Sequence, residues 1–418
     1  MMIGSTGKSM TTMMMAALID QGKIRWDTPV AEIYPDFALS DPALTWKITL
    51  RNMVCNCTGI QRHNLEMQFA NRPTTPEGVI RSLRSLGFTG EFGKTFGYVN
   101  QMAASGGYIA AWTAREPGRS VYENYLEQMQ RNVFDPIGMQ STTFSFEWVQ
   151  ANPDHATPHG QTGAGEYVPI PLEMEKILEP FAPAGASWSN ARDAARYLIT
   201  QLNQGVAPNG KRVVSAENLT ETWKPQVEIQ PGIHYGLGWM IGSYQGRRFL
   251  SHSGGTSGFA SELTFLPDAG LGIVVLTNAE YGALFAASVR SRIIELVFGQ
   301  PADAKYSTRL EEVRKRFDEA QATVRPVDGR TVAPSLGRYW NASLGEVKLK
   351  VNRGRLILDI PGFPTELRTP GDGTYVFWDP PLVGAFLRFS KNADGTPTFI
   401  LDAESLDIPE KYTFARSK

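Results

Sequence analysis

The sequence predicts an α+β fold: an antiparallel sheet flanked by helices, followed by a small C-terminal antiparallel β-domain. Three observations predict it. Apolar residues recur at helical spacing through the first half of the chain, strand-like segments joined by turns follow residue 235, and the apolar period falls to two beyond residue 330. The length of 418 residues suggests more than one domain.

The first expected helix spans residues 9–21. Its apolar residues keep helical spacing (Met10, Met13, Met14, Ala17 and Leu18), and Gly22 is a natural residue to end it. Because most of its surface is apolar, this helix should be buried. Further helices are expected at 49–55, 101–113, 121–133, 191–204 and 284–298, with a short one ending near Tyr34.

The second half of the chain reads mainly as strands. They are expected at 235–241, 248–252, 260–266 and 272–276. A charged amphipathic helix over 308–322, with Leu310, Val313 and Phe317 on one face, and a linker over 325–329 come next. The segments 347–351 and 356–360 flank a hairpin turn, and further short strands at 375–378, 386–389, 398–401 and 412–414 indicate a small barrel or sandwich.

The composition excludes several classes of function. The net charge of −1 gives no basic field for nucleic acid, and no apolar stretch is long enough to span a membrane. Cys55 and Cys57 are poorly placed for a disulfide at i, i+2, and two thiols alone make no metal site. We expect both to be small buried residues that say nothing about the compartment. Residues 1–3 show no signal peptide, so periplasm and cytoplasm of a bacterium both stay open.

Ser5 and Lys8 are the first candidate catalytic pair. At i, i+3 they lie on one helical face, so the amine can reach the hydroxyl. A lysine made neutral by burial can take the proton of a serine that attacks a carbonyl. Tyr98 offers a phenol that relays this proton, and Asn100 an amide that holds Lys8 and the substrate.

The segment from His252 to Gly255 is expected to face Ser5 on a strand. The backbone N–H of Ser5 and a second N–H from the strand that carries Gly254 and Gly255 would then stabilise an oxyanion, and glycine there would let the substrate lie close to the backbone. Each of these residues has an ordinary alternative, such as a helix cap for Ser5, a solvated side chain for Lys8 or a satisfied core histidine for His252. Their order along the chain, and not any one of them, favours the catalytic interpretation.

In this order the motifs resemble the serine β-lactamase and penicillin-binding-protein superfamily, in its class C-like branch of D-aminopeptidases, D,D-carboxypeptidases and esterases. The resemblance also includes Pro183-Ala184-Gly185 and Tyr235-Gly236-Leu237-Gly238-Trp239. It implies a β-lactamase-like domain with a helical subdomain over residues 1–300, a helix and linker over 301–330, and a lipocalin-like β-barrel over 331–418. It also implies Ser5 as nucleophile, Lys8 and Tyr98 as acid/base pair, and Asn100 as the residue that orients Lys8 and the substrate. His252 and Gly254 would belong to the third motif, and the N–H groups of Ser5 and Gly255 would form the oxyanion hole.

Three departures from the family pattern stand out. His252 occupies a position where β-lactamases carry a lysine, which favours peptide, amide or ester substrates over β-lactams. Asn56-Cys57-Thr58-Gly59 replaces His-Thr-Ser-Gly, where we expect a structural effect only. Relatives also carry strands before the nucleophile, so we expect a truncated chain or one begun at an internal methionine.

The sequence therefore predicts a serine hydrolase that forms an acyl-enzyme and acts as a peptidase or amidase on short peptides, including those with D- or non-standard residues. No cofactor or metal is expected, and a homo-oligomer is left open. Two alternatives stay open: a carboxylesterase with weak β-lactamase activity, and a penicillin-binding sensor that acylates without turnover.

Overall fold

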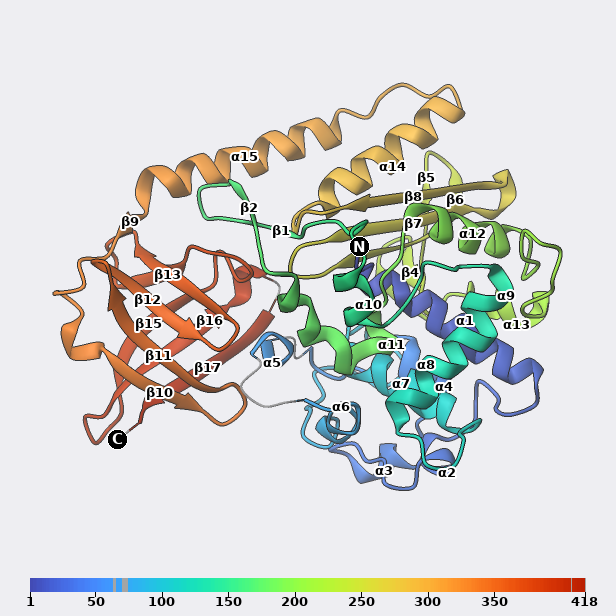
Figure 1. Ribbon diagram of the computed structural model, residues 1–418, viewed down its shortest axis with the longest axis horizontal. Coiled ribbons are helices and arrows are strands. Elements are labelled where there is room, and N and C mark those ends of the chain that lie inside the picture. Colours follow the sequence, from blue (N-terminus) through green and yellow to red (C-terminus); the bar gives the residue numbers. More distant parts are fainter. Residues whose placement is uncertain (63–64, 70–73, 407, 418) are drawn as a thin grey trace.

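A computed structural model describes residues 1–62, 65–69, 74–406 and 408–417, and it confirms the α+β class (Figure 1). A sheet covered by helices carries one apolar core, and a C-terminal barrel carries a second. Among the described residues, no helix is both long and apolar enough to cross a bilayer.

The central sheet has six antiparallel strands in chain order. They are β3 (Val227–Gln230), β4 (Ile233–Tyr235), β5 (Met240–Tyr244), β6 (Arg247–Gly255), β7 (Ala260–Leu266) and β8 (Leu271–Thr277). Strand β7 is buried along its whole length, because successive side chains alternate between two covered faces. Leu263 and Phe265 enter the main core, while Leu266 packs with Ile294 of helix α14 (Ala283–Val297) on the other face.

Helices fill the first half of the chain, as predicted. The described α-helices there are α1 (Gly7–Asp20), α2 (Val30–Ile33), α3 (Pro42–Thr45), α4 (Leu50–Val54), α5 (Leu65–Gln68), α6 (Pro76–Ser82), α7 (Asn100–Trp112), α8 (Val121–Met129), α9 (Asp135–Ile137), α10 (Phe146–Ala151), α11 (Ala182–Gly185), α12 (Ala191–Leu202) and α13 (Ala216–Glu221). A 3-10 helix η1 (Gly4–Thr6) leads into α1, and η3 (Leu172–Phe181) precedes α11. Residues 7–18, most of helix α1, are buried, which confirms the expectation for its methionine-rich surface.

The C-terminal domain is a closed antiparallel barrel. Its strands are β10 (Gly337–Asn341), β11 (Gly345–Asn352), β12 (Arg355–Ile360), β13 (Phe363–Thr369), β14 (Thr374–Phe377), β15 (Phe386–Lys391), β16 (Pro397–Ala403) and β17 (Ile408–Arg416). Pairing of β12 with β13 closes the ring. The predicted hairpin is confirmed, since Asn352 pairs with Arg355 and both residues between them have positive φ, as a two-residue turn needs.

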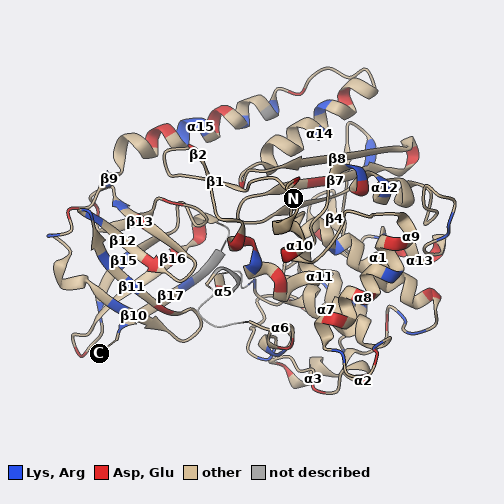
Figure 2. Ribbon diagram, viewed as in Figure 1, with Lys and Arg blue, Asp and Glu red and all other residues tan. Residues whose placement is uncertain are grey.

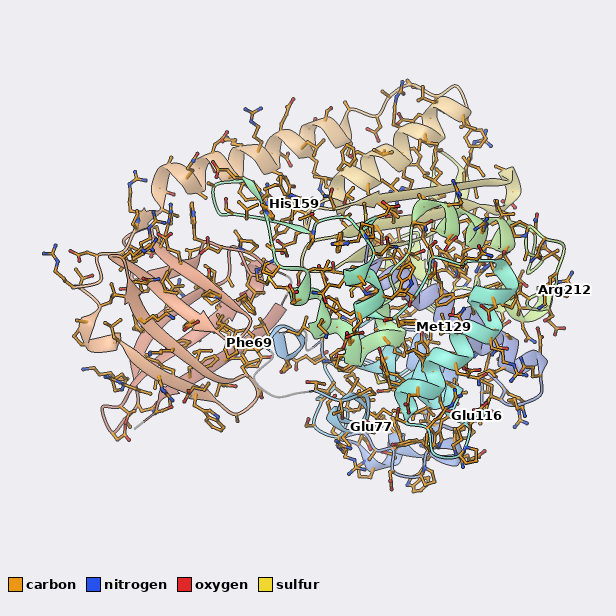
Figure 3. All side chains as sticks on the ribbon, viewed as in Figure 1. Phe69, Glu77, Glu116, Met129, His159 and Arg212 are labelled. Atoms are coloured by element: carbon orange, nitrogen blue, oxygen red, sulfur yellow. A yellow bond between two sulfur atoms is a disulfide. The ribbon has the colours of Figure 1, made fainter. Side chains whose placement is uncertain are left out.

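Two segments join the barrel to the rest of the molecule. Leu65 and Phe69 of the α5 segment are buried in the barrel core, and the Tyr412 hydroxyl donates to Glu66 at 2.7 Å. Figure 3 shows Phe69 between the barrel and the helical half of the molecule. Helix α15 (Lys305–Thr323) runs over the hairpin of β1 (His159–Gln161) and β2 (Tyr167–Pro169) towards the barrel (Figure 1).

Helix α15 is mostly exposed, and acidic and basic residues alternate along its ribbon (Figure 2). The face that we predicted to be apolar is only partly covered. Its residue Phe317 lies against Gly165 of the β1–β2 turn, whereas its residue Leu310 is 42% exposed. The segment that we expected as a linker is in part a strand, β9 (Arg325–Pro326), which pairs with β13. The domain boundaries at 300 and 330 stay a prediction.

Two local expectations are wrong. The segment 235–241 is not one strand, because residues 236–239 form a turn closed by the Gly236 N–H on the Trp239 carbonyl at 2.7 Å. Gly238 has a φ of 79° there and lies against the Lys8 backbone, where a side chain would clash.

The second error concerns the cysteines, which are buried as expected but form a disulfide. The intervening Asn56 has a φ of 51°, which turns the chain so that the Cα atoms of Cys55 and Cys57 are 5.2 Å apart. That separation lies within the range that a disulfide spans.

Candidate active site

The turn that carries Ser5 is enclosed by glycines. Gly4 has a φ of 53°, which sets the entry into η1, and Gly185 of α11 lies directly against the Gly4–Ser5 peptide. A Cβ on Gly254 would come within 2.1 Å of the Ile3 carbonyl oxygen and 3.0 Å of the Ser5 nitrogen. The backbone of β6 therefore packs directly against the turn that carries Ser5, and the oxyanion hole stays a prediction.

Lys8 begins the buried helix α1, and its amine has three neighbours. The Lys8 Nζ atom lies 2.8 Å from each of Ser5 Oγ, Asn100 Oδ1 and the Ala184 carbonyl oxygen. The amide and carbonyl oxygens only accept hydrogen bonds, so two N–H groups of the amine donate to them. In the neutral amine the remaining tetrahedral position is the lone pair, which points towards the Ser5 hydroxyl.

The electrostatics favour this neutral form. Burial lowers the pKa of Lys8 well below its usual value, and the Arg62 guanidinium lowers it further. Arg62 is half-buried, and its guanidinium carbon lies 5.9 Å from the centre of the Tyr98 ring, while the Lys8 Nζ lies 4.8 Å from the same centre. Two positive charges near the same ring repel each other. Because Lys8 is more deeply buried than Arg62, the Lys8 amine is the group that loses its proton.

Tyr98 and Asn100 lie at the start of helix α7, separated by its N-cap residue Val99. Burial raises the pKa of the Tyr98 phenol, although a hydrogen bond with Ser5 and the Arg62 charge both oppose this. Tyr98 therefore rests as a neutral phenol next to the Ser5 hydroxyl. With a neutral amine on the other side, Ser5 has a proton acceptor and a proton donor within contact.

His252 is buried and uncharged. Burial, and then the Lys8 charge, lowers its pKa to about 3, against a hydrogen bond to Ser253. The Nδ1–H donates to the Ser253 carbonyl at 2.6 Å, because a carbonyl only accepts, so Nε2 accepts from the Tyr235 hydroxyl at 3.0 Å. Burial and these two bonds therefore keep the imidazole neutral at pH 7, unlike the lysine that β-lactamases carry at this position.

The strand that carries the third motif is paired on one edge only. Strand β5 pairs with β6 as far as Ser251, whereas β7 continues to Gly255. Among the described strands, residues 252–255 therefore have an unpaired edge next to the glycine-lined turn. A pocket of about 430 Å³ lies between η3, α5 and the β12–β13 turn, and it reaches Ser257 just beyond this edge.

The structure thus brings together Ser5, Lys8, Tyr98 and Asn100, with Gly254 against the Ser5 nitrogen and the Gly255 backbone against Gly4. His252 belongs to the same cluster through ring contacts with Tyr98 and Tyr235, at 6.0 and 5.8 Å. Sequence reasoning missed the contribution of Arg62, because nothing in its local pattern distinguishes it from a solvated arginine. It quoted Ala184 and Tyr235 in motifs without assigning their roles.

Comparison with known proteins identifies the family. The beta-lactamase family model matches residues 1–298, which is most of the chain. The chain belongs to this family. The superfamily resemblance and the fold class predicted from the sequence are therefore confirmed.

Curated relatives are hydrolases and penicillin-binding proteins. An unguisins hydrolase of Aspergillus campestris is 26% identical over 383 residues, covering 85% of this chain and 69% of its own. Penicillin-binding protein 4 of Amycolatopsis lactamdurans is 24% identical over 350 residues, covering 80% and 83%.

Solved structures share the fold. The octameric penicillin-binding protein homologue of Pyrococcus abyssi matches with a TM-score of 0.63 at 19% identity, over 99% of this chain and 88% of its own. A D-amino acid amidase of Ochrobactrum anthropi matches with a TM-score of 0.57 at 19% identity, over 71% and 83%. The first of these matches includes the barrel.

Proposed function

We propose that this chain is a serine hydrolase that forms an acyl-enzyme on Ser5 and cleaves amide bonds of short peptides, including those with D- or non-standard residues. One observation carries the proposal. The buried Lys8 amine has two of its directions taken by acceptors and turns the third to the Ser5 hydroxyl. This is the arrangement that a general base for a serine nucleophile needs.

In the proposed reaction, Ser5 Oγ attacks the carbonyl carbon as its proton passes to the Lys8 lone pair. The N–H groups of Ser5 and Gly255 stabilise the negative oxygen. The Tyr98 phenol gives its proton to the leaving nitrogen, so the C–N bond breaks and the ester on Ser5 remains. The proton that Lys8 took from Ser5 then returns Tyr98 to its neutral form. Water, deprotonated by the same pair, then releases the acid and restores the Ser5 hydroxyl.

The neutral His252 and the unpaired strand edge favour a peptide or amide substrate over a β-lactam. A neutral His252 with both ring nitrogens engaged offers no fixed cation for the carboxylate of a β-lactam. The unpaired edge at 252–255 suits the backbone of an extended peptide. The name of one curated relative, unguisins hydrolase, agrees with hydrolysis, and that of one structural neighbour, D-amino acid amidase, agrees with cleavage of an amide bond.

A substrate panel tests the proposal. The chain and its Ser5→Ala variant are assayed with D-aminoacyl p-nitroanilides, p-nitrophenyl butyrate and nitrocefin, and intact mass follows the Ser5 adduct. We expect turnover of the anilides, loss of at least about a thousandfold in Ser5→Ala, and little nitrocefin hydrolysis. Turnover of the ester alone would refute the peptidase assignment, and a lasting adduct without product would indicate a sensor.

The oligomeric state needs a separate experiment. Light scattering during size-exclusion chromatography tests whether the chain forms a homo-oligomer, since the Pyrococcus homologue is octameric.

A further inference from the structure

We infer that Asn56, held between the disulfide-bonded Cys55 and Cys57, is a positioning residue that ties the Tyr98/Asn100 motif to the His252 motif, and that reduction of this disulfide slows the reaction. The inference concerns the regulation of the site and rests on the proposed function.

The Asn56 side chain joins two motifs that are far apart in the sequence. Its Oδ1 accepts from the Val99 N–H at 3.2 Å, and Val99 lies between Tyr98 and Asn100. The side chain also hydrogen-bonds the Tyr235 phenol. Because Oδ1 already faces an N–H donor, the amide nitrogen is the atom that donates to Tyr235.

The chain of hydrogen bonds continues with a fixed direction. The Tyr235 hydroxyl donates to His252 Nε2 at 3.0 Å, and His252 Nδ1 donates to the Ser253 carbonyl at 2.6 Å. In this series of hydrogen bonds, Asn56, Tyr235 and His252 each accept one hydrogen bond from the preceding group and donate one to the next group. Asn56 is 3% exposed and His252 is also 3% exposed, so water does not readily replace a lost partner.

The disulfide holds Asn56 in the conformation that this chain requires. Asn56 has a φ of 51°, in the left-handed region, and the bonded cysteines are its two neighbours. The Gly97 N–H also donates to the Asn56 carbonyl at 2.9 Å, and this bond attaches the same turn to the segment that leads into Tyr98. Without the covalent link, the backbone at Asn56 can relax towards the right-handed region, which moves its amide away from Val99 and Tyr235.

The proposed switch is a two-electron reduction. A dithiol attacks one sulfur as a thiolate, forms a mixed disulfide, and closes its own ring to release the second sulfur. The products are two cysteine thiols and an oxidised dithiol, and the two protons come from the dithiol. Since the chain has two cysteines, any effect of the reductant on its cysteines belongs to this pair.

The test measures how fast a fluorophosphonate labels Ser5, by intact mass, before and after dithiothreitol, with free thiols counted by alkylation. We expect labelling of the oxidised chain, and a rate about tenfold lower once both thiols are free. The Cys55→Ala/Cys57→Ala variant should show the lower rate and no response to dithiothreitol.

Three variants at position 56 separate positioning from stability. Asn56→Gly keeps the left-handed backbone and Asn56→Asp keeps the shape, but neither donates to Tyr235, so both should label about tenfold more slowly. Asn56→His supplies an acceptor and a donor and should restore most of the rate. A purely structural role predicts that Asp and His variants of equal thermal stability label equally fast.

The outcomes distinguish this inference from the proposed function. An oxidised chain that does not label at Ser5 overturns the proposed function. An oxidised chain that labels normally, with reduced and cysteine-free forms that label just as fast, overturns the inference alone. Free thiols in the air-oxidised chain, or equal rates for the Asp and His variants, also overturn it.

Discussion

Replacing Arg62 by glutamine should move the acid limb of the pH–rate profile upward. The rate depends on the neutral fraction of Lys8, which grows as the pH rises through its pKa. The Arg62 cation disfavours a proton on Lys8 and lowers that pKa. Without the cation the pKa of Lys8 rises, so a higher pH is needed for the same rate.

The geometry sets the size of this effect. Lys8 Nζ and the Arg62 guanidinium carbon lie 4.8 and 5.9 Å from the same ring centre, so their separation is at most the sum of these distances. At roughly 10 Å and an effective dielectric constant of about 20, the repulsion is about 1.7 kcal/mol, or about one pH unit. Solvent around the half-buried Arg62 weakens it, so we expect roughly half to one pH unit.

The assay is kcat/KM against pH for a turned-over anilide, with matched variants. Arg62→Lys keeps the charge and should leave the acid limb in place. Arg330→Gln removes an exposed cation from the segment that precedes the barrel and should do the same. The assignment of Lys8 as a base whose pKa is lowered by Arg62 would be refuted in two cases. In one, the apparent pKa of the acid limb is unchanged in Arg62→Gln; in the other, it shifts equally in Arg62→Lys.

Three further predictions concern the oxyanion strand, the third motif and the barrel. Gly254→Ala should lower kcat by about a hundredfold, because its Cβ would meet the Ile3 carbonyl oxygen at 2.1 Å and displace the backbone from Ser5; a kcat within a factor of three of wild type would contradict this. His252→Gln should leave the limbs of the pH–rate profile between about pH 5 and 9 in place, since the pKa of His252 is about 3; a limb that vanishes with the histidine would show that it titrates there. Phe399→Ala should destabilise the barrel by about 3–5 kcal/mol in urea unfolding followed by circular dichroism, because its buried ring stacks on Phe414 at 4.7 Å; a loss under 1 kcal/mol would show that the core readily closes the gap.

Much of the fold was predictable because it follows from local periodicity. The segment 260–266 coincides with β7, and the hairpin around Arg353 was evident from its turn residues. The pairing of Ser5 with Lys8 needed only the geometry of one helical turn. The resemblance to a known family supplied the rest of the candidate site.

What the sequence could not show depends on single backbone angles and on distant partners. The disulfide exists because Asn56 takes a positive φ, and no pattern of residue types announced that. The break in 235–241 depends on Gly238 lying against the Lys8 backbone, more than 200 residues away. Likewise, Leu65 and Phe69 look like ordinary helix residues until the barrel encloses them.

The burial of the α5 segment inside the barrel has a consequence for protein engineering. The barrel is not a detachable module, because excising it would expose Leu65 and Phe69. A graft of the helical half onto a different accessory domain would need a new cover for these two side chains. The two halves of the molecule therefore depend on each other through one short segment.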